Sequence, residues 1–273
     1  MHERERKEAL RISPRKYLSQ HFLVNPQVAL RIVEAAEISS SDPVLEIGPG
    51  GGALTGLLLE RSREVVVVEI DPRLCSLLRE RFGGDPRFRL VEGDVLKVNL
   101  GELISEGGWT IVGSLPYHIT SPVLFLLAEH REKVRRAVVM VQREVGRRMT
   151  ASPGSRDYGL LSVMLRLDAR PEYLFEVRPG NFLPRPKVTS AVVRLDFTEP
   201  YPLQPRDRET FKRLVKAAFG GRRKMLRNSL SSLAPPEVLL EASRKAGVDL
   251  SLRAEQVPLE GFVMLADSLS RRS

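Results

Sequence analysis

Short apolar runs alternate with amphipathic segments along the first two thirds of the chain. Apolar residues recur at helical spacing in two of the amphipathic segments, 73–82 and 122–130. The apolar runs have the length of strands and occupy residues 44–47, 64–70, 88–91, 109–112 and 136–141. Continuous runs such as the four valines at 65–68 are typical of parallel strands that are buried on both faces of a sheet. The pattern predicts an α/β fold built from repeated strand–helix–strand units.

Two more strands are predicted, at 173–177 and 188–197, which brings the sheet to about seven strands. The residues of the second alternate between two faces, so this strand could be a partner in a terminal hairpin. The composition changes after Phe197, where a proline-rich stretch has the residues of a linker. Only helical spacing follows it. The chain therefore divides into an α/β domain over 1–198 and a small all-helical domain over 199–273.

The charge of the chain indicates a polyanionic partner. Its 273 residues include 43 Lys and Arg against 34 Asp and Glu, a formal net charge of +9, and the pI is about 10.0. The single cysteine excludes an internal disulfide and suits a reducing compartment. No apolar run approaches the roughly 20 residues of a membrane span, and residues 1–7 lack the apolar core of a signal peptide. We expect a cytoplasmic protein with no membrane partner.

A glycine-rich turn follows the first predicted strand of the sheet, with Gly48 and Gly50 ahead of Ala53. Glycine suits such a turn because it tolerates positive φ and lets a ligand approach the backbone closely. The strand, turn and helix resemble the opening of a nucleotide-binding unit. This spacing also fits the dinucleotide fingerprint loosely, so other residues must decide which ligand is bound.

Three acidic residues lie near the strand ends where such a ligand would bind. Glu69 ends the second strand, where a carboxylate accepts hydrogen bonds from ribose hydroxyls in both NAD and S-adenosylmethionine (SAM) enzymes. Glu46 precedes the glycines and favours SAM, because a carboxylate there repels a pyrophosphate but orients the cationic amino acid moiety of SAM. Asp94 follows the third strand and could accept the exocyclic amine of the cofactor's adenine. Asp71 with Pro72 is instead predicted to cap the next helix.

The tetrapeptide Ser114-Leu115-Pro116-Tyr117 follows the fourth strand, at the same edge of the sheet. It resembles the element of enzymes that methylate the exocyclic amine of adenine. This amine is a poor nucleophile because its lone pair is delocalised into the ring. A polar side chain and a backbone carbonyl near Pro116 can accept its hydrogens and direct the lone pair at the methyl group. The proline fixes the direction of the carbonyl, and Tyr117 offers a ring for base stacking.

Further motifs occur in the order of one known family. They are Gln20-His21-Phe22-Leu23, Glu46–Gly50, Tyr158-Gly159 with Leu161-Ser162-Val163, Phe182 with Pro184, Pro186-Lys187-Val188 and Ser190, and the segment from Arg222 to Leu230. Over about residues 16–230 the chain resembles the KsgA/RsmA family of small-subunit ribosomal RNA adenine dimethyltransferases. The resemblance implies a Rossmann-like SAM-dependent methyltransferase that dimethylates two adjacent adenosines near the 3′ end of small-subunit rRNA, in an immature ribosomal subunit.

The resemblance also implies roles for single residues. His21 and Leu23 would border SAM, Gly48 would lie under its amino acid portion, Glu69 would hold the ribose, and Asp94 the adenine amine. Ser114 would lie beside the methyl group and the target amine, with Leu115, Pro116 and Tyr117 around it, and Phe182 would be the second aromatic face against the flipped base. The family usually has asparagine where this chain has His21 and Ser114. We expect little loss at His21, and slower turnover at Ser114 because a hydroxyl reaches less far than a carboxamide.

Basic residues gather in three segments: the arm at 1–19, which we expect to be flexible, residues 131–148, and residues 206–227. The last has nine cations and two carboxylates. Contacts of such residues with phosphates give affinity that does not depend on sequence. We expect RNA contacts in the helical domain from Arg222, Arg223, Lys224 and Arg227.

Three other readings remain open. A large-subunit rRNA methyltransferase of the Erm type shares the first motifs, although the segments 182–190 and 222–230 argue against it. A ribosome-assembly factor with weakened catalysis is suggested by Ser114 alone, and an NAD oxidoreductase is disfavoured by Glu46 and by 114–117. The four histidines and the cysteine have no metal-ligand spacing, so SAM is expected as the methyl donor without a metal. We expect a monomer.

Overall fold

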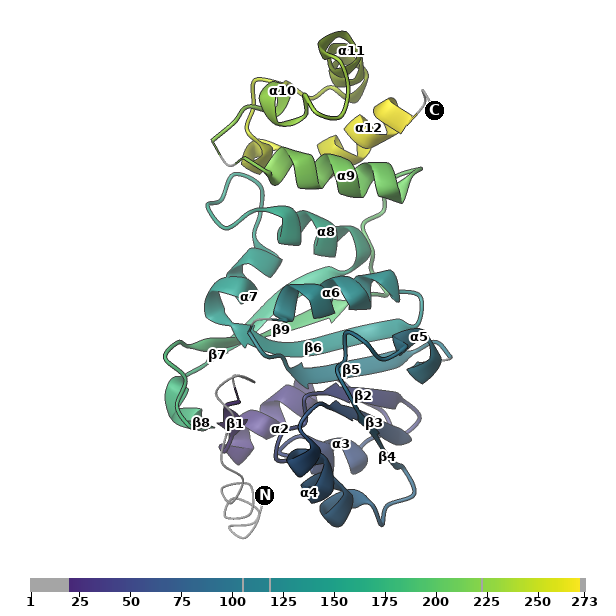
Figure 1. Ribbon diagram of the computed structural model, residues 1–273, viewed down its shortest axis with the longest axis vertical. Coiled ribbons are helices and arrows are strands. Elements are labelled where there is room, and N and C mark those ends of the chain that lie inside the picture. Colours follow the sequence, from purple (N-terminus) through teal and green to yellow (C-terminus); the bar gives the residue numbers. More distant parts are fainter. Residues whose placement is uncertain (1–19, 105, 118, 222, 271–273) are drawn as a thin grey trace. The chain divides into compact units, whose positions relative to one another are not determined.

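The structure is a computed structural model that describes residues 20–104, 106–117, 119–221 and 223–270 (Figure 1). The chain forms two compact units. The first comprises Met1–Gly146 and Arg170–Thr198, and the second Arg147–Ala169 and Glu199–Ser273. In the described part of the chain, no helix has both the length and the apolar character needed to span a membrane.

A seven-stranded sheet forms the centre of the first unit, in the order β4-β3-β2-β5-β6-β9-β7. Strands β4 to β6 pair in parallel, and β9 pairs antiparallel with both β6 and β7. The bounds are β2 Pro43–Ile47, β3 Glu64–Glu69, β4 Phe88–Glu92, β5 Trp109–Ser114, β6 Val134–Gln142, β7 Arg170–Val177 and β9 Ser190–Asp196. The predicted α/β fold with seven strands is confirmed. The alternating strand β9 is inserted between β6 and β7.

Helices connect the parallel strands and begin at caps that the sequence supplies. Asn25 accepts hydrogen bonds from the backbone N–H groups of Gln27 and Val28 at the start of α2, and Asp71 accepts one from Arg73 at the start of α4. Proline occupies the first position of both helices, where its missing N–H costs nothing. The helices of this unit are α2 Pro26–Ala35, α3 Thr55–Leu59, α4 Pro72–Phe82, α5 Leu100–Leu103 and α6 Thr120–Glu129, followed by α7 Arg143–Thr150 at its boundary.

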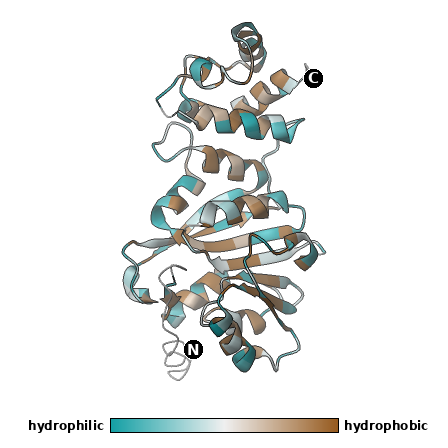
Figure 2. Cartoon of the chain, in the orientation of Figure 1, coloured by the Kyte–Doolittle hydropathy of each residue, from teal (hydrophilic) through white to brown (hydrophobic). Residues whose placement is uncertain are grey.

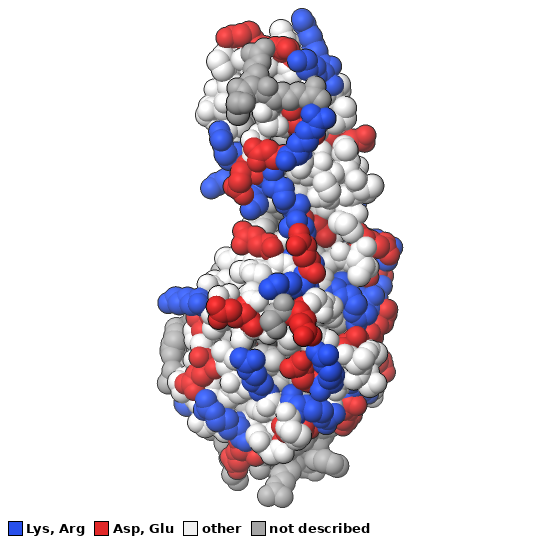
Figure 3. All heavy atoms as spheres, turned by 90° about the vertical axis from the view of Figure 1, so that its right-hand side faces the viewer, with Lys and Arg blue, Asp and Glu red and all other residues white. Residues whose placement is uncertain are grey.

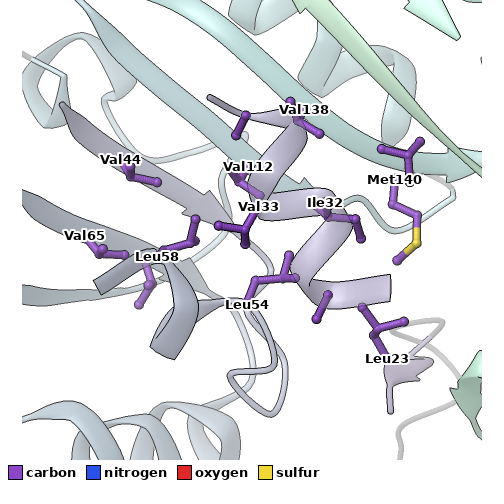
Figure 4. Packing of buried hydrophobic residues seen from close by; sticks show 14 of the residues in the cluster. Leu23, Ile32, Val33, Val44, Leu54, Leu58, Val65, Val112, Val138 and Met140 are labelled. Atoms are coloured by element: carbon purple, nitrogen blue, oxygen red, sulfur yellow. The ribbon is translucent and has the colours of Figure 1, made fainter. Parts of the chain in front are cut away.

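The inner strands β2, β3 and β5 are buried on both faces along nearly their whole length, which explains their uninterrupted apolar runs (Figure 2). Val44, Val65 and Val112 pack against Ile32 and Val33 of α2 and Leu58 of α3 in one core cluster (Figure 4). Their neighbours along the strands point to the opposite face and are buried as well: Leu45, Val66 and Ile111. Packing on both faces holds the strand ends rigidly, which suits a site at the carboxyl edge of the sheet.

A second, two-stranded sheet joins segments that are far apart in sequence. Strand β1 (Phe22–Leu23) pairs antiparallel with β8 (Phe182–Leu183), so that Leu23 lies opposite Phe182. The short helix η2 (Pro179–Asn181) precedes β8, and the side-chain amide of Asn25 donates to that of Asn181 at 2.8 Å. This pairing brings the Gln20–Leu23 motif next to Phe182.

The second unit is mainly helical. Its elements are α8 Leu160–Asp168, α9 Arg208–Phe219, α10 Leu226–Ser229, α11 Pro236–Ala246, η3 Ala254–Gln256 and α12 Leu259–Ser270. The Phe219 ring packs against Tyr158 and Phe262. Residues 147–169 thus group with the C-terminal helices, whereas the sequence placed them in the first domain. The physical reason is contact: Arg208 of α9 forms an ion pair with the buried Asp168 at the end of α8.

Candidate active site

One cavity lies at the carboxyl edge of the parallel strands of the first unit. The ends of β2, β3, β5 and β6 border it, together with the turn after β4 and the β1–β8 pair. Its lining includes all eleven residues that the sequence named for cofactor or base: His21, Leu23, Glu46, Gly48, Glu69, Asp94, Ser114, Leu115, Pro116, Tyr117 and Phe182. Residues that lie far apart along the chain therefore share one site.

The glycine turn has a backbone that only glycine adopts readily. Gly48 and Gly50 have φ of +68° and +56°. A Cβ on Gly50 would lie 3.2 Å from the Phe22 ring, and one on Gly48 would lie 3.4 Å from the carbonyl oxygen of Ser114. The turn thus packs closely against both β1 and the end of β5, and it presents backbone rather than side chains to the cavity.

Glu69 is held in place by the backbone around it. Its Oε1 accepts from the N–H groups of Ile70 and Asp71, both at 2.9 Å, and its Oε2 accepts from Gly50 at 3.3 Å. Burial raises the pKa of this carboxyl, while the three backbone donors act in the opposite direction. Because the contact to Gly50 is long, Oε2 keeps capacity to accept further hydrogen bonds from a ligand in the cavity.

Glu46 is a second buried carboxyl at the cavity wall, and burial raises its pKa to about 8. The Thr55 hydroxyl donates to its Oε2 at 2.6 Å and opposes the shift, whereas the charge of Glu69 adds to it. A carboxyl in this setting favours a cationic ligand group. The buried carboxylate has lost its favourable hydration energy, and only an opposite charge nearby compensates for that loss.

The two aspartates at the edge differ in their surroundings. Asp94 lines the cavity, and its Oδ1 accepts from the N–H of Leu96 at 3.0 Å. Asp71 is fully buried at the start of α4, where the Arg73 side chain lowers its pKa to about 2 and Gln20 also donates to it. This agrees with the capping role that the sequence predicted for Asp71.

The tetrapeptide from Ser114 to Tyr117 turns from β5 into α6. The Leu115 N–H donates to the Met140 carbonyl at 3.0 Å, and the Pro116 carbonyl accepts from the N–H of Ile119 and from the Thr120 hydroxyl. The Pro116 carbonyl is therefore engaged by the start of α6. The carbonyl that immediately precedes the proline, that of Leu115, is the better candidate for an acceptor aimed at a ligand.

Aromatic rings flank this turn. The Tyr117 and His21 rings are stacked, with centroids 6.3 Å apart and an angle of 29° between planes, and the Tyr117 hydroxyl lies 3.3 Å from that of the buried Ser190. Phe182 lines the cavity although only 3% of it is exposed, so most of its ring also packs in the core cluster. A planar group entering the cavity would meet these rings.

Comparisons with known proteins show the family of the chain. A model of the ribosomal RNA adenine dimethylase family matches residues 12–271. The chain belongs to this family. A relative from Geobacter metallireducens is 41% identical over 264 residues, which cover 94% of this chain and 96% of that protein. One from Pseudomonas aeruginosa is 43% identical over 258 residues, 94% of either chain. Both are named ribosomal RNA small subunit methyltransferase A.

Solved structures of dimethylases and related enzymes share the fold. A dimethyladenosine transferase from Plasmodium falciparum superimposes with a TM-score of 0.77 at 28% identity, covering 90% of this chain and 96% of that one. The 23S rRNA methyltransferase ErmE gives a TM-score of 0.69 at 31% identity, covering 91% and 99%. The predicted Rossmann-like methyltransferase fold with C-terminal helices is thereby confirmed.

Sequence reasoning missed several residues that line this cavity. Ile70 directly follows β3, Val95 lies in the turn after β4, and Met140 lies near the end of β6. Ile70 is 48% exposed, an unusual state for an isoleucine beside a buried strand. The position directly after Glu69 was the signal that could have identified it. Ser190 was named only as the last residue of the family motif that begins at Phe182, and a serine in an alternating strand gives no sign of its own that it lines a cavity.

The predicted RNA-contacting residues are not among those that line this cavity and belong to the second unit. Arg223, Lys224 and Arg227 are exposed there, while Arg222 and the predicted basic arm at 1–19 lie outside the described residues. Some other cations of the 206–227 segment are paired with acids: Arg206 with Asp267, Arg208 with Asp168 and Lys212 with Glu209. On the face in Figure 3, basic and acidic side chains are intermixed. Among the residues that the structure describes, no three His, Cys, Asp or Glu side chains gather in a group suited to a metal ion.

Proposed function

We propose that this dimethylase-family chain transfers methyl groups from SAM to the exocyclic amines of two adjacent adenosines near the 3′ end of small-subunit rRNA. The substrate is an immature small ribosomal subunit in the cytoplasm, and the enzyme acts as a monomer. The observation that supports this most is the cavity in which Gly48, Glu69 and Asp94 meet the segment 114–117. The first three suit an adenosine-containing cofactor, and the last suits an adenine amine.

The cofactor would extend along the carboxyl edge of the sheet. Its amino acid portion lies over Gly48, with the ammonium group near Glu46, and its ribose hydroxyls donate to Oε2 of Glu69. Its adenine amine donates to Asp94, and the exposed Ile70 packs on the base. His21 and Leu23 close the site from the β1 side. Ser114, at the end of β5, would then lie beside the methyl group that SAM supplies.

The target adenine would enter beside Tyr117 and Phe182. The Ser114 hydroxyl and the Leu115 carbonyl accept the two amine hydrogens, which draws the nitrogen towards tetrahedral geometry and directs its lone pair at the methyl carbon. The nitrogen–carbon bond forms as the carbon–sulfur bond breaks, the sulfur keeps the electron pair, and the amine proton leaves to solvent. Positioning carries most of the rate in such an in-line displacement.

RNA contacts outside the cavity are proposed for Arg222, Arg223, Lys224 and Arg227 of the second unit. Exposed cations contact phosphates without reading sequence. The fold around the target and the exposed loop that presents it would then supply recognition. The division of labour is chemistry in the first unit and RNA affinity in the helical domain.

The test is methyl transfer from labelled SAM to small subunits from cells that lack this dimethylation, followed by nucleoside analysis. Label in dimethyladenosine supports the proposal. Label that enters only large-subunit RNA would assign the chain to the Erm type instead. Tight binding to small subunits without any label would indicate an assembly factor.

Ser114→Asn is expected to raise turnover several-fold. The carboxamide, which the family usually has at this position, reaches further towards the target amine than the hydroxyl and can donate a hydrogen bond elsewhere while it accepts one. Single-turnover methylation of small subunits measures the change. Ser114→Ala is the matched control and should be slower than the natural protein. Equal rates for the natural protein and the Ser114→Asn variant would refute the view that serine limits this enzyme.

Ser190→Ala is expected to lower kcat for RNA methylation about three- to tenfold, the range of one neutral hydrogen bond, with SAM affinity unchanged. Its hydroxyl is the polar partner of the Tyr117 hydroxyl and fixes the direction of that ring. Tyr117→Phe should have the same effect. The double variant should lose no more kcat than either single variant, because both substitutions break the same contact. Additive losses would show that the contact between Ser190 and Tyr117 does not orient the ring.

A further inference from the structure

A short exposed segment borders the cavity and has no role so far. Residues 183–188, with the sequence Leu-Pro-Arg-Pro-Lys-Val, connect Phe182 to β9, and we refer to them as the 183–188 loop. Both anchors of this loop, Phe182 and Ser190, line the cavity. Leu183 is one residue from the first anchor and Val188 is two residues from the second, a chain distance of at most about 7 Å. The loop therefore starts and ends beside the cavity.

The loop is held at both ends and in the middle. Leu183 pairs with Phe22 in the β1–β8 sheet, His21 Nδ1 lies 2.9 Å from the Pro184 carbonyl oxygen, and the Thr189 carbonyl accepts from the N–H of Arg143 at 3.0 Å. Pro186 is buried. Two prolines in six residues restrict the backbone further. Because the loop is already ordered, a ligand that binds it loses little binding free energy to the entropy of ordering a flexible segment.

The exposed side chains of the loop are of two kinds. Leu183 and Val188 are each 43% exposed, which is high for large apolar residues beside a cavity. Arg185 and Lys187 are exposed between them, and neither forms an ion pair with a carboxylate in the described part of the chain. The loop itself contains no acidic residue. Cations next to apolar side chains match a polyanion that also has apolar faces, and single-stranded RNA is such a ligand.

We propose that the 183–188 loop binds the nucleotides next to the target adenosine. Arg185 and Lys187 contact backbone phosphates there, and Leu183 and Val188 pack against the bases or riboses. This inference rests on the proposed function, since it requires an RNA whose adenosine enters the cavity. It adds an RNA-binding surface in the catalytic unit, which holds the flanking nucleotides close to the point where the target base leaves the stack.

The test compares Arg185→Ala/Lys187→Ala with the natural protein on undermethylated small subunits at several salt concentrations. The KM for subunits should rise roughly tenfold, and the slope of log KM against log salt should fall by about one to two, as expected for two lost phosphate contacts. SAM affinity should not change. The matched control is Arg89→Ala, which removes one exposed arginine from β4, the strand at the far edge of the sheet. Arg89→Ala should change neither the KM for subunits nor the slope of log KM against log salt.

A photo-crosslinking residue placed at Lys187 identifies the occupant. Crosslinks to rRNA nucleotides adjacent to the methylated adenosines support the proposal. Crosslinks only to ribosomal protein overturn it and assign the loop to a protein contact. An unchanged KM and salt slope in a variant that still methylates overturn the loop proposal alone. If the natural protein transfers no methyl group to rRNA, both the proposed function and the loop proposal fail.

Discussion

Glu69→Ala is expected to weaken SAM binding a hundredfold or more. The carboxylate would accept both ribose hydroxyls, and hydrogen bonds to a charged group contribute roughly 1.5–3 kcal/mol each. The backbone already fixes its direction, because Ile70 and Asp71 donate to Oε1 and leave Oε2 towards Gly50 and the cavity. Calorimetry with SAM measures the loss directly.

The same substitution also removes the acceptor of two backbone N–H groups, so a structural effect must be separated from a binding effect. Glu69→Gln serves this purpose, since its remaining oxygen can still accept from Ile70 and Asp71. The probe is S-adenosylhomocysteine beside its analogue with a deoxyribose. The natural protein should prefer the ribose form, and both variants should bind the two forms almost equally. If the variants keep that preference, Glu69 does not contact the ribose.

The carboxyl edge of the sheet could be predicted because parallel strands end at one side. Gly48, Glu69, Asp94 and Ser114 each follow or end a predicted strand, and all of them line the cavity. Their convergence requires only the strand order and the alternation of strand and helix. The predicted strand bounds agree with the observed ones within a few residues. A strand that is buried on both faces consists of an unbroken apolar run, and the length of that run gives the length of the strand.

What the sequence did not predict depends on contacts between distant segments. Strands β1 and β8 have two residues each, too few for any periodicity, and their pairing joins positions about 160 residues apart. Ser190 reaches Tyr117 only because β9 lies between β6 and β7. The grouping of 147–169 with the helices after 198 follows from the Arg208–Asp168 ion pair and the packing of α8 on α9. Asp168 thereby pairs with Arg208, one of the nine cations of the 206–227 segment for which RNA contact was expected.

Glu46→Gln is expected to stabilise the ligand-free protein at pH 8 while weakening SAM binding. The pKa of Glu46 rises from 4.5 to about 8 on folding, chiefly because the side chain is buried. Below pH 4.5 the carboxyl is protonated in both states. Between the two values the unfolded chain loses the proton and the folded chain keeps it, so the stability of the folded state falls as pH rises. The full loss is about 5 kcal/mol, at roughly 1.4 kcal/mol per pKa unit.

Glutamine has no proton to lose, and its oxygen can still accept from the Thr55 hydroxyl. The stability of the variant should therefore depend less on pH, and its advantage should grow from near zero at about pH 4.5 to several kcal/mol at about pH 8. Denaturant unfolding across this range measures it. Glu80→Gln, an exposed change on α4, is the matched control and should leave the pH profile unchanged.

Opposite effects on stability and affinity would identify Glu46 as a residue kept for binding at a cost to the fold. In the proposed complex the ammonium group of SAM would supply a positive charge beside Glu46, so the ionised carboxylate would be favourable only when SAM is bound. The glutamine variant should be more stable without SAM and should bind SAM more weakly. SAM should therefore raise its unfolding temperature less than that of the natural protein. A variant that is more stable and still binds SAM with full affinity would contradict this role. The amino acid portion of the cofactor would then have to be held by the backbone of the glycine turn alone.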